Sequence, residues 1–414
     1  MEAMDIQAVE SKLSDVTVTA IPMSGKNVHK DMGHGGNSHA TISTVPAASP
    51  SSIGKDKDNG TSNMEVRWNT KWRWDTGYSA DSVEWCPVEG YRNVLVCGTY
   101  QLDKKDEGVE QATKQKRLGR IYLFNIDSAT TELSPIQTID TSGILDQKWC
   151  CHLVQNYPIL AAVTSEGDLA LYRLYIEEIY SLKLWVSYKL DQDILVLSLD
   201  WSTNKMNSGE VCLVVSDSSG HVTVLMLAED EIQKVGVWKA HDYEAWIVGF
   251  NYWNPAVFYS GGDDCSFKCY DTRIPDLPVS SNKAHGAGVT AIRSHVQVEH
   301  QLLTGSYDEK VRLWDARTLK RCVSERDVNG GVWRLKWHPC ENNTVLAACM
   351  YGGFRILTVE GTRVDVVSEY MEHESIAYGA DWKHNGDSLI ATCSFYDCRL
   401  HISELTKPNC CINN

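Results

Sequence analysis

SGGDDCSFKCYDTR (residues 260–273) and TGSYDEKVRLWDAR (residues 304–317) align without a gap. The two segments begin 44 residues apart, and each joins two short strand-like runs through a turn that contains Asp. A period of about 40 to 45 residues is typical of a four-stranded propeller blade. This pair of segments therefore predicts an all-β protein built from repeated blades.

Weaker copies of the same unit begin at Ser216, Ala347 and Ala391. The first strand of the unit also recurs, and in most copies it ends in Trp. The predicted strand ends are Trp85, Trp149, Trp201, Trp253, Ser294, Trp337 and Trp382. Their successive spacings are 64, 52, 52, 41, 43 and 45 residues, which predicts a seven-bladed WD40-type β-propeller.

The domain boundaries follow from changes in composition. Residues 1–63 are rich in Ser, Thr, Gly, Asn and Lys without apolar periodicity, which predicts a disordered N-terminal tail. The propeller is expected over residues 64–408, with a short C-terminal tail over 409–414. The run at 65–77, EVRWNTKWRWDTG, is predicted to complete the last blade and close the ring. The charged run at 103–117 is predicted to be a surface hairpin loop of blade one.

Charge and composition exclude several classes of function. The net charge of −15 opposes binding to a phosphate backbone, so we expect no nucleic-acid partner. We expect no membrane partner, because no apolar run approaches the roughly 18 to 20 residues that span a bilayer. The 14 cysteines form no paired CxxC motifs, which favours free thiols in a reducing compartment and no metal site. A cytoplasmic monomer without a cofactor is therefore expected.

The sequence contains no GxSxG, GxxxxGK or HExxH motif. Two sets of triad-type residues do occur, but at equivalent positions of neighbouring repeats. In WD repeats these positions form a hydrogen-bond network with a strand aromatic, here Tyr270 or Trp314, and a catalytic triad would not be needed twice. We therefore interpret as structural the two sets His241, Ser260, Asp264 and His285, Thr304, Asp308.

A further group of residues stands just before or at the start of the first strands. In a propeller these positions surround the central opening of one face, where ligands bind. The residues there are Asp81, Glu84, Asp146, Glu244, Trp246, Trp333, Arg334, Tyr378 and Asp381. For the tryptophans, packing between blades is the alternative, and for each carboxylate the alternative is a solvated rim.

Several strings resemble one family, the WD-repeat diphthine methyltransferase family of diphthamide biosynthesis, which acts as a diphthine methylesterase. They include DTSGILDQKWC, HDYEAWIVGFNYW, GGVWRLKWHP and ATCSFYD, and the similarity runs from about Asp81 to Ile402. The resemblance implies hydrolysis of the methyl ester of methylated diphthine on translation elongation factor 2, its protein substrate. The products are diphthine and methanol.

The resemblance supplies no catalytic motif, so the site is a hypothesis from the residues. Methylated diphthine carries a trimethylammonium group, which aromatic faces attract. We expect Trp246, Trp333 and Tyr378 to bind this cation. Asp146 or Glu244 would act as general base on a water, and Arg334 would stabilise the oxyanion.

Two non-catalytic alternatives remain open from the sequence. The first is a WD-repeat scaffold that brings partners together, which the absence of a nucleophile motif favours. The second is a trafficking adaptor that recognises linear peptides on the same face. Release of methanol by the purified chain would distinguish the esterase from both.

Overall fold

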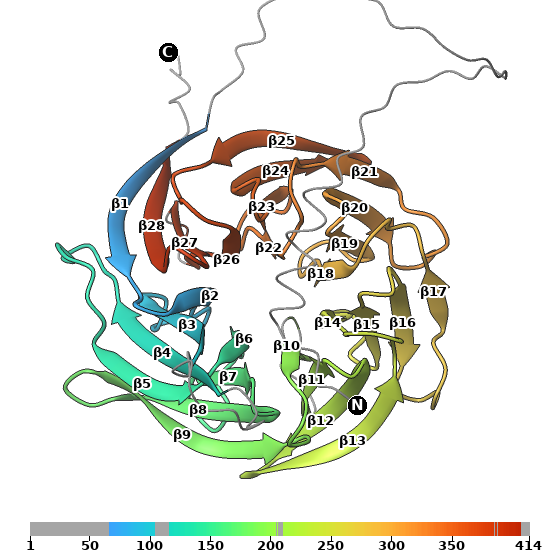
Figure 1. Ribbon diagram of the computed structural model, residues 1–414, viewed down its shortest axis with the longest axis horizontal. Helices are drawn as coiled ribbons and strands as arrows, with labels where there is room; N and C mark the ends of the chain where they lie inside the picture. Colours follow the sequence, from blue (N-terminus) through green and yellow to red (C-terminus); the bar gives the residue numbers. More distant parts are fainter. Residues whose placement is uncertain are drawn as a thin grey trace, which may run out of the picture. The chain divides into compact units, whose positions relative to one another are not determined.

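The computed structural model describes residues 66–103, 116–203, 205, 210–384, 386 and 388–406. The described residues contain strands and turns but no helix, and their 28 strands form seven four-stranded sheets arranged around an axis (Figure 1). The predicted seven-bladed β-propeller is therefore confirmed. No helix among these residues could cross a membrane.

Each blade is an antiparallel sheet with its first strand nearest the axis, and consecutive strands pair except where β28 pairs with β1 (Figure 1). From the innermost strand outward, blade one consists of β2 (Ser79–Trp85), β3 (Val94–Leu102), β4 (Arg117–Asn125) and β5 (Gln137–Ser142). Blade two consists of β6 (Ile144–Trp149), β7 (Ile159–Thr164), β8 (Asp168–Ile176) and β9 (Tyr180–Lys189). Blade three consists of β10 (Val196–Trp201), β11 (Val211–Asp217), β12 (His221–Ala228) and β13 (Glu231–Lys239).

Blades four to seven continue the pattern. Blade four consists of β14 (Ile247–Phe250), β15 (Val257–Gly261), β16 (Phe267–Asp271) and β17 (Ser280–Asn282), and blade five of β18 (Val289–Ser294), β19 (Gln301–Ser306), β20 (Lys310–Asp315) and β21 (Ser324–Asp327). Blade six consists of β22 (Arg334–Trp337), β23 (Thr344–Ala348), β24 (Phe354–Glu360) and β25 (Arg363–Tyr370). Blade seven consists of β26 (Ala377–Trp382), β27 (Leu389–Ser394), β28 (Arg399–Thr406) and β1 (Arg67–Asp75).

The ring is closed by the predicted strand from the other end of the propeller. β1 pairs antiparallel with β28 from Arg67 opposite Thr406 to Asp75 opposite Arg399, and so forms the outermost strand of blade seven. Residues of β1 alternate between exposed and half-buried, which places its tryptophans on one face. Two of them, Trp72 and Trp74, pack against the core that blades one and seven share. Closure by β1 covers the edge that β28 would otherwise expose.

Indole groups tie neighbouring blades together. Most innermost strands end in a buried Trp whose Nε1 donates to a backbone carbonyl of the preceding blade. These bonds are Trp149 to Glu84 at 3.2 Å, Trp201 to Lys148 at 2.9 Å, Trp337 to Arg293 at 3.5 Å and Trp382 to Lys336 at 3.0 Å. A buried indole usually finds such a partner, which favours Trp at these strand ends. Trp85 of β2 is an exception, since its Nε1 is buried without a partner among the described residues.

One predicted strand end is displaced. β14 ends at Phe250, three residues before the predicted Trp253, which lies in the following turn. The Asn251 carboxamide oxygen accepts backbone N–H bonds from Trp253 and Asn254, which stabilises this turn. The Trp253 indole still donates to the carbonyl of His295, in the next blade, at 2.9 Å.

Three sequence predictions fall on residues outside the described ones. Strands β3 and β4 pair up to Leu102 opposite Arg117, as a hairpin requires, but the tip of the predicted loop, residues 104–115, is not described. The N-terminal segment 1–63 and the C-terminal segment 409–414 also lie outside the described residues. Their predicted disorder stays a prediction.

The closing strand generates a stability prediction. The Trp74 ring lies edge-on to Tyr122 at 4.7 Å and Phe124 at 5.2 Å. Replacing Trp74 with Ala removes these contacts, and we expect a loss of about 3 kcal/mol in the free energy of unfolding. Differential scanning calorimetry should show a lower Tm for Trp74→Ala and a smaller decrease for Trp74→Phe. A Trp74→Ala protein that unfolds at the wild-type temperature would contradict the assigned closure.

Candidate active site

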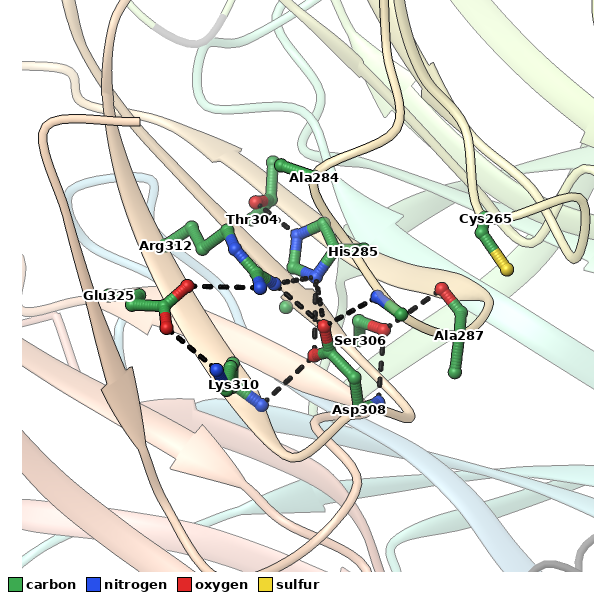
Figure 2. Close-up of polar contacts among 12 residues, drawn as sticks. Cys265, Ala284, His285, Ala287, Thr304, Ser306, Asp308, Lys310, Arg312 and Glu325 are labelled. Atoms are coloured by element: carbon green, nitrogen blue, oxygen red, sulfur yellow. Dashed lines mark hydrogen bonds and ion pairs between the residues drawn. The ribbon is translucent and has the colours of Figure 1, made fainter. Parts of the chain in front are cut away.

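The triad-type residues of blade five form a buried structural network (Figure 2). The Trp314 indole donates to the Thr304 hydroxyl at 2.8 Å, and that hydroxyl lies 2.8 Å from His285 Nε2. His285 Nδ1 lies 3.1 Å from Asp308. The Thr304 hydroxyl accepts from the indole, which can only donate, and His285 bridges this hydroxyl and Asp308. The hydroxyl is fully buried and already used, so this geometry favours the structural interpretation.

Blade four repeats the network with one difference. His241 contacts Ser260 at 2.8 Å and Asp264 at 2.9 Å, as predicted. The Tyr270 hydroxyl, however, donates to the backbone carbonyl of Ala240 at 3.5 Å instead of joining the serine. A phenol on this strand extends further than an indole N–H, which explains the change of acceptor.

Blade seven holds a third copy that the sequence interpretation missed. His373 Nε2 lies 2.9 Å from Thr392 Oγ1, the same 19-residue separation as in blades four and five. Its Nδ1 contacts Ser394 at 2.5 Å, and Ser394 in turn donates to Asp397. The Asp stands one position later than in the other two copies, and the 19-residue His-to-hydroxyl spacing was the available signal.

The predicted aromatic residues meet near the axis. In each blade, one residue stands four positions before the last residue of the innermost strand. We call these seven residues the axial ring. Its members are Asp81, Leu145, Leu197, Trp246, Thr290, Trp333 and Tyr378. The Trp246 and Trp333 rings are 5.9 Å apart and edge-on, and the Trp333 and Tyr378 rings are 4.7 Å apart. Both tryptophans are half-buried, whereas Tyr378 is 9% exposed.

Two further aromatics extend this group and were not predicted. The Tyr307 ring lies 6.2 Å from Trp246 and 6.1 Å from Trp333, and Phe395 lies 4.8 Å from Tyr378. Each directly follows the second strand of its blade, in the strings TGSY and TCSF. Aligning these equivalent positions across the repeats would have found them. Among the described residues, the Tyr307 hydroxyl and the Trp333 N–H are buried without a hydrogen-bond partner.

Asp146 and Arg334 are brought together from non-adjacent blades. Arg334 of β22 lies 3.3 Å from the Asp146 carboxylate of β6 and donates to the carbonyl of Leu145 at 3.4 Å. Asp146 also pairs with Lys148 and accepts the backbone N–H of Leu199 at 3.0 Å. Burial favours a raised pKa for Asp146, but the two cations and this bond outweigh it and lower the pKa. The structure thus holds Asp146 as a fully engaged anion.

Glu244 lies apart from that pair. Its carboxylate is largely buried, and no hydrogen bond to it is present among the described residues. Its backbone carbonyl accepts a hydrogen bond from the backbone N–H of Asp263. The Asp263 carboxylate in turn accepts a hydrogen bond from the Trp246 indole N–H at 3.1 Å. Burial raises the pKa of the Tyr307 phenol, and the charges of Asp263 and Glu244 add to the rise, so the Glu244 carboxylate lies near this aromatic group.

A second layer, of mixed charge, lies three positions further along the innermost strands, and we call it the charged ring. Its members are Glu84, Lys148, Asp200, Gly249, Arg293, Lys336 and Asp381. Lys336 pairs with Glu84 and lies 3.5 Å from Asp381, while Arg293 lies 3.7 Å from Asp200. Burial raises the pKa of Glu84 to about 7, against the opposing charge of Lys336. Opposite charges from different blades therefore compensate one another within the ring.

Asp81 is the carboxylate of the axial ring. It is 3% exposed, and its Oδ2 is buried without a hydrogen-bond partner in the described part of the chain. Burial raises the pKa of Asp81 well above its ordinary value, with Arg334 opposing and Asp146 adding to the rise. The described residues include no group of three or more His, Cys, Asp or Glu side chains placed to hold a metal ion.

Two family models match the chain. Residues 277–315 match "WD domain, G-beta repeat", which spans β17 to β20. Residues 1–65, which precede the described part, match "Cyclin-dependent kinase 2-associated protein". Among solved structures, one chain of a mitotic checkpoint complex superposes with a TM-score of 0.61 at 16% identity, covering 88% of this chain and 98% of that chain. At that identity the likeness concerns the fold alone. The chain is thus a WD-repeat β-propeller with an aromatic and charged site at its axis.

Curated relatives specify the family. Proteins named diphthine methyltransferase are 43% identical in Mus musculus, covering 74% of this chain and 68% of the mouse protein, and 42% identical in Homo sapiens, covering 74% and 73%. A Dictyostelium discoideum protein named diphthine methyltransferase homolog is 36% identical, covering 80% of this chain and 97% of its own length. The chain belongs to the diphthine methyltransferase family.

The network of blade five predicts a pH dependence of stability. Burial would raise the pKa of Asp308, but hydrogen bonds from His285 and Arg312 lower it far below its usual range. A lowered folded-state pKa adds stability above the unfolded value of about 3.9, and this stability is lost as the pH falls below that value. Asp308→Asn should therefore reduce the Tm at pH 7 by several degrees and make the Tm decrease less steeply between about pH 5 and 2. Parallel acid dependence in both proteins would contradict this role.

Proposed function

We propose that this protein hydrolyses the methyl ester of methylated diphthine on translation elongation factor 2, releasing diphthine and methanol. Membership of the diphthine methyltransferase family supports the substrate. The single structural observation that supports the chemistry is the axial ring, where three aromatic side chains stand beside Arg334 and buried carboxylates. The proposed setting is a cytoplasmic monomer, since the substrate is a translation factor.

The aromatic group suits the cationic part of the substrate. A trimethylammonium group cannot donate a hydrogen bond, so it is held by aromatic faces and by negative charge. Trp246, Trp333 and Tyr378 supply the faces, and the Tyr307 ring lies at similar distances from both tryptophans. Asp263 and Glu244 supply negative charge near this aromatic group. The net charge of −15 favours the same cation at longer range.

Arg334 suits the ester part. Its side chain crosses from blade six to Asp146 of blade two, and its guanidinium carbon lies 5.7 Å from the Trp333 ring centre. A guanidinium has five N–H donors, so the contacts with Asp146 and Leu145 leave others for the carbonyl oxygen of the ester. These donors would stabilise the negative charge that develops on that oxygen when water attacks. Asp146 then fixes the orientation of Arg334.

Hydrolysis also requires a base that removes a proton from water. Asp146 and Glu244 are the residues that the sequence predicts for this role, and substitution of each by its amide tests it. A non-catalytic scaffold remains the alternative function. It predicts that the purified chain binds the elongation factor without removing the methyl group.

The aromatic group generates a direct prediction. Trp246→Ala and Trp333→Ala should each raise KM for the methylated factor by roughly two- to thirtyfold, since one good cation–π contact contributes about 0.5 to 2 kcal/mol. The matched control is Trp185→Ala, which removes an indole from the outermost strand β9 of blade two and should leave KM unchanged. Folded Trp246→Ala and Trp333→Ala proteins with wild-type KM and kcat would overturn the proposed cation site.

A further inference from the structure

Asp81 differs from the other acidic residues of the innermost strands. Asp146, Asp200 and Asp381 each accept a backbone N–H from the next blade, at 3.0, 2.9 and 2.7 Å. These three carboxylates therefore join blades. No described residue makes a corresponding hydrogen bond to Asp81, and its Oδ2 is buried without a partner. A buried carboxylate oxygen left in this state costs free energy, so a role outside the fold is expected.

The backbone places Asp81 in a β-bulge of β2. The pairing of β2 with β3 shifts between Ala80 and Ser82, so Asp81 is the unpaired residue of a β-bulge. Bulges redirect side chains and are common beside active sites. Tyr378 occupies the equivalent bulge in blade seven, where the pairing of β26 with β27 shifts between Ala377 and Ala380. The same shift recurs at the equivalent positions of β6, β10 and β18, so the bulge belongs to the repeat. The carboxylate at this position is particular to blade one.

The two bulges lie close together. Gly379 of β26 packs so tightly on β2 that a Cβ there would stand 2.8 Å from Val83 N and 2.9 Å from Ser82 Cα. This contact brings the backbone next to Tyr378 against the backbone next to Asp81. Asp81 is also the one carboxylate of the axial ring, the same ring that supplies Trp246, Trp333 and Tyr378.

The charges around Asp81 come from several blades. The titratable and charged groups that act on it are Arg334 of β22, Asp146 of β6 and the Cys393 thiol of β27. Burial and the Asp146 charge raise the pKa of Asp81, whereas Arg334 opposes the rise. A base is most effective when its pKa approaches the working pH, and this environment moves Asp81 in that direction. Asp146, in contrast, has a lowered pKa and four partners.

We propose that Asp81 is the general base of the ester hydrolysis, which rests on the proposed function. Asp81 takes a proton from a water molecule while the water oxygen bonds to the ester carbonyl carbon. Arg334 stabilises the resulting oxyanion. The carbon–methoxide bond then breaks, and Asp81 returns the proton to the methoxide, which leaves as methanol. The product carboxylic acid ionises to diphthine and releases its proton to solvent.

The experiment compares four full-length proteins on methylated diphthine elongation factor 2: the wild type, Asp81→Asn, Asp146→Asn and Glu244→Gln. Loss of the methyl group is followed by intact mass spectrometry, and binding and Tm are measured for each protein. We expect Asp81→Asn to bind the factor with wild-type affinity and to lose kcat by roughly 100-fold or more. Asp146→Asn should lower the Tm, because it removes an anion with two cationic partners. Glu244→Gln should weaken binding of the factor, because it removes negative charge near the aromatic group.

A second measurement uses the wild type alone. Its kcat/KM should rise with pH along a limb whose midpoint lies above the ordinary Asp value of about 3.9, because the ionised base is the active form. Asp81→Glu should retain part of the activity and shift this limb, which a merely structural residue would not do.

The outcomes separate the two proposals. Wild-type turnover together with full turnover by a folded Asp81→Asn protein overturns the role of Asp81 and leaves the esterase intact. If Asp81→Asn does not fold, a wild-type rate without the expected pH limb overturns that role instead. Binding of the factor by the wild type without loss of the methyl group removes the esterase function, and the role of Asp81 with it.

Discussion

The propeller depends on hydrogen bonds that pass from one blade to the backbone of the next. Indole N–H groups at the ends of the innermost strands donate to carbonyls of the preceding blade, as Trp201 does to Lys148. Carboxylates on the same strands accept N–H groups from the following blade, as Asp200 does from Phe250. Buried polar atoms must find such partners, so each bond also fixes the angle and distance between two sheets. Strand β1 completes the circle from the other end of the chain.

Once these bonds are satisfied, a small set of polar groups at the axis remains. Lys336, Glu84 and Asp381 compensate one another across blades, as do Arg334 and Asp146. Asp81 Oδ2, the Tyr307 hydroxyl and the Trp333 N–H have no such partner among the described residues. Within the described part of the chain, the fold therefore leaves the Asp81 carboxylate oxygen Oδ2 and two donors without partners beside an aromatic surface. This arrangement is what the proposed esterase chemistry uses.

Much of the architecture could be predicted from the sequence because a propeller repeats. The period gave the seven blades, and the Trp-rich segment at 65–77 marked the closing strand β1. The prediction was wrong at Trp253, since an Asn251 turn ends β14 early. The network of His373 was missed because its Asp is shifted by one residue. A repeat pattern identifies equivalent positions but is insensitive to such local insertions.

The site was predicted only in part, for a physical reason. Trp246, Trp333 and Tyr378 do lie together, because all three occupy equivalent positions of the repeat. The engagement of Asp146 could not be predicted, since Arg334 reaches it from a blade that is distant along the chain. Likewise, the lack of a partner for Asp81 Oδ2 among the described residues depends on how side chains from several blades pack, which the sequence pattern does not specify. The catalytic roles of these residues stay predictions.

The most direct test of the account is incubation of the purified chain with methylated diphthine elongation factor 2 in the absence of any other protein. Intact mass spectrometry follows the factor, and released methanol is measured in parallel. We expect the factor to lose one methyl mass with release of an equal amount of methanol, and neither change in a control without the chain. Retention of the methyl group on a factor that the chain demonstrably binds would contradict the esterase and favour a scaffold.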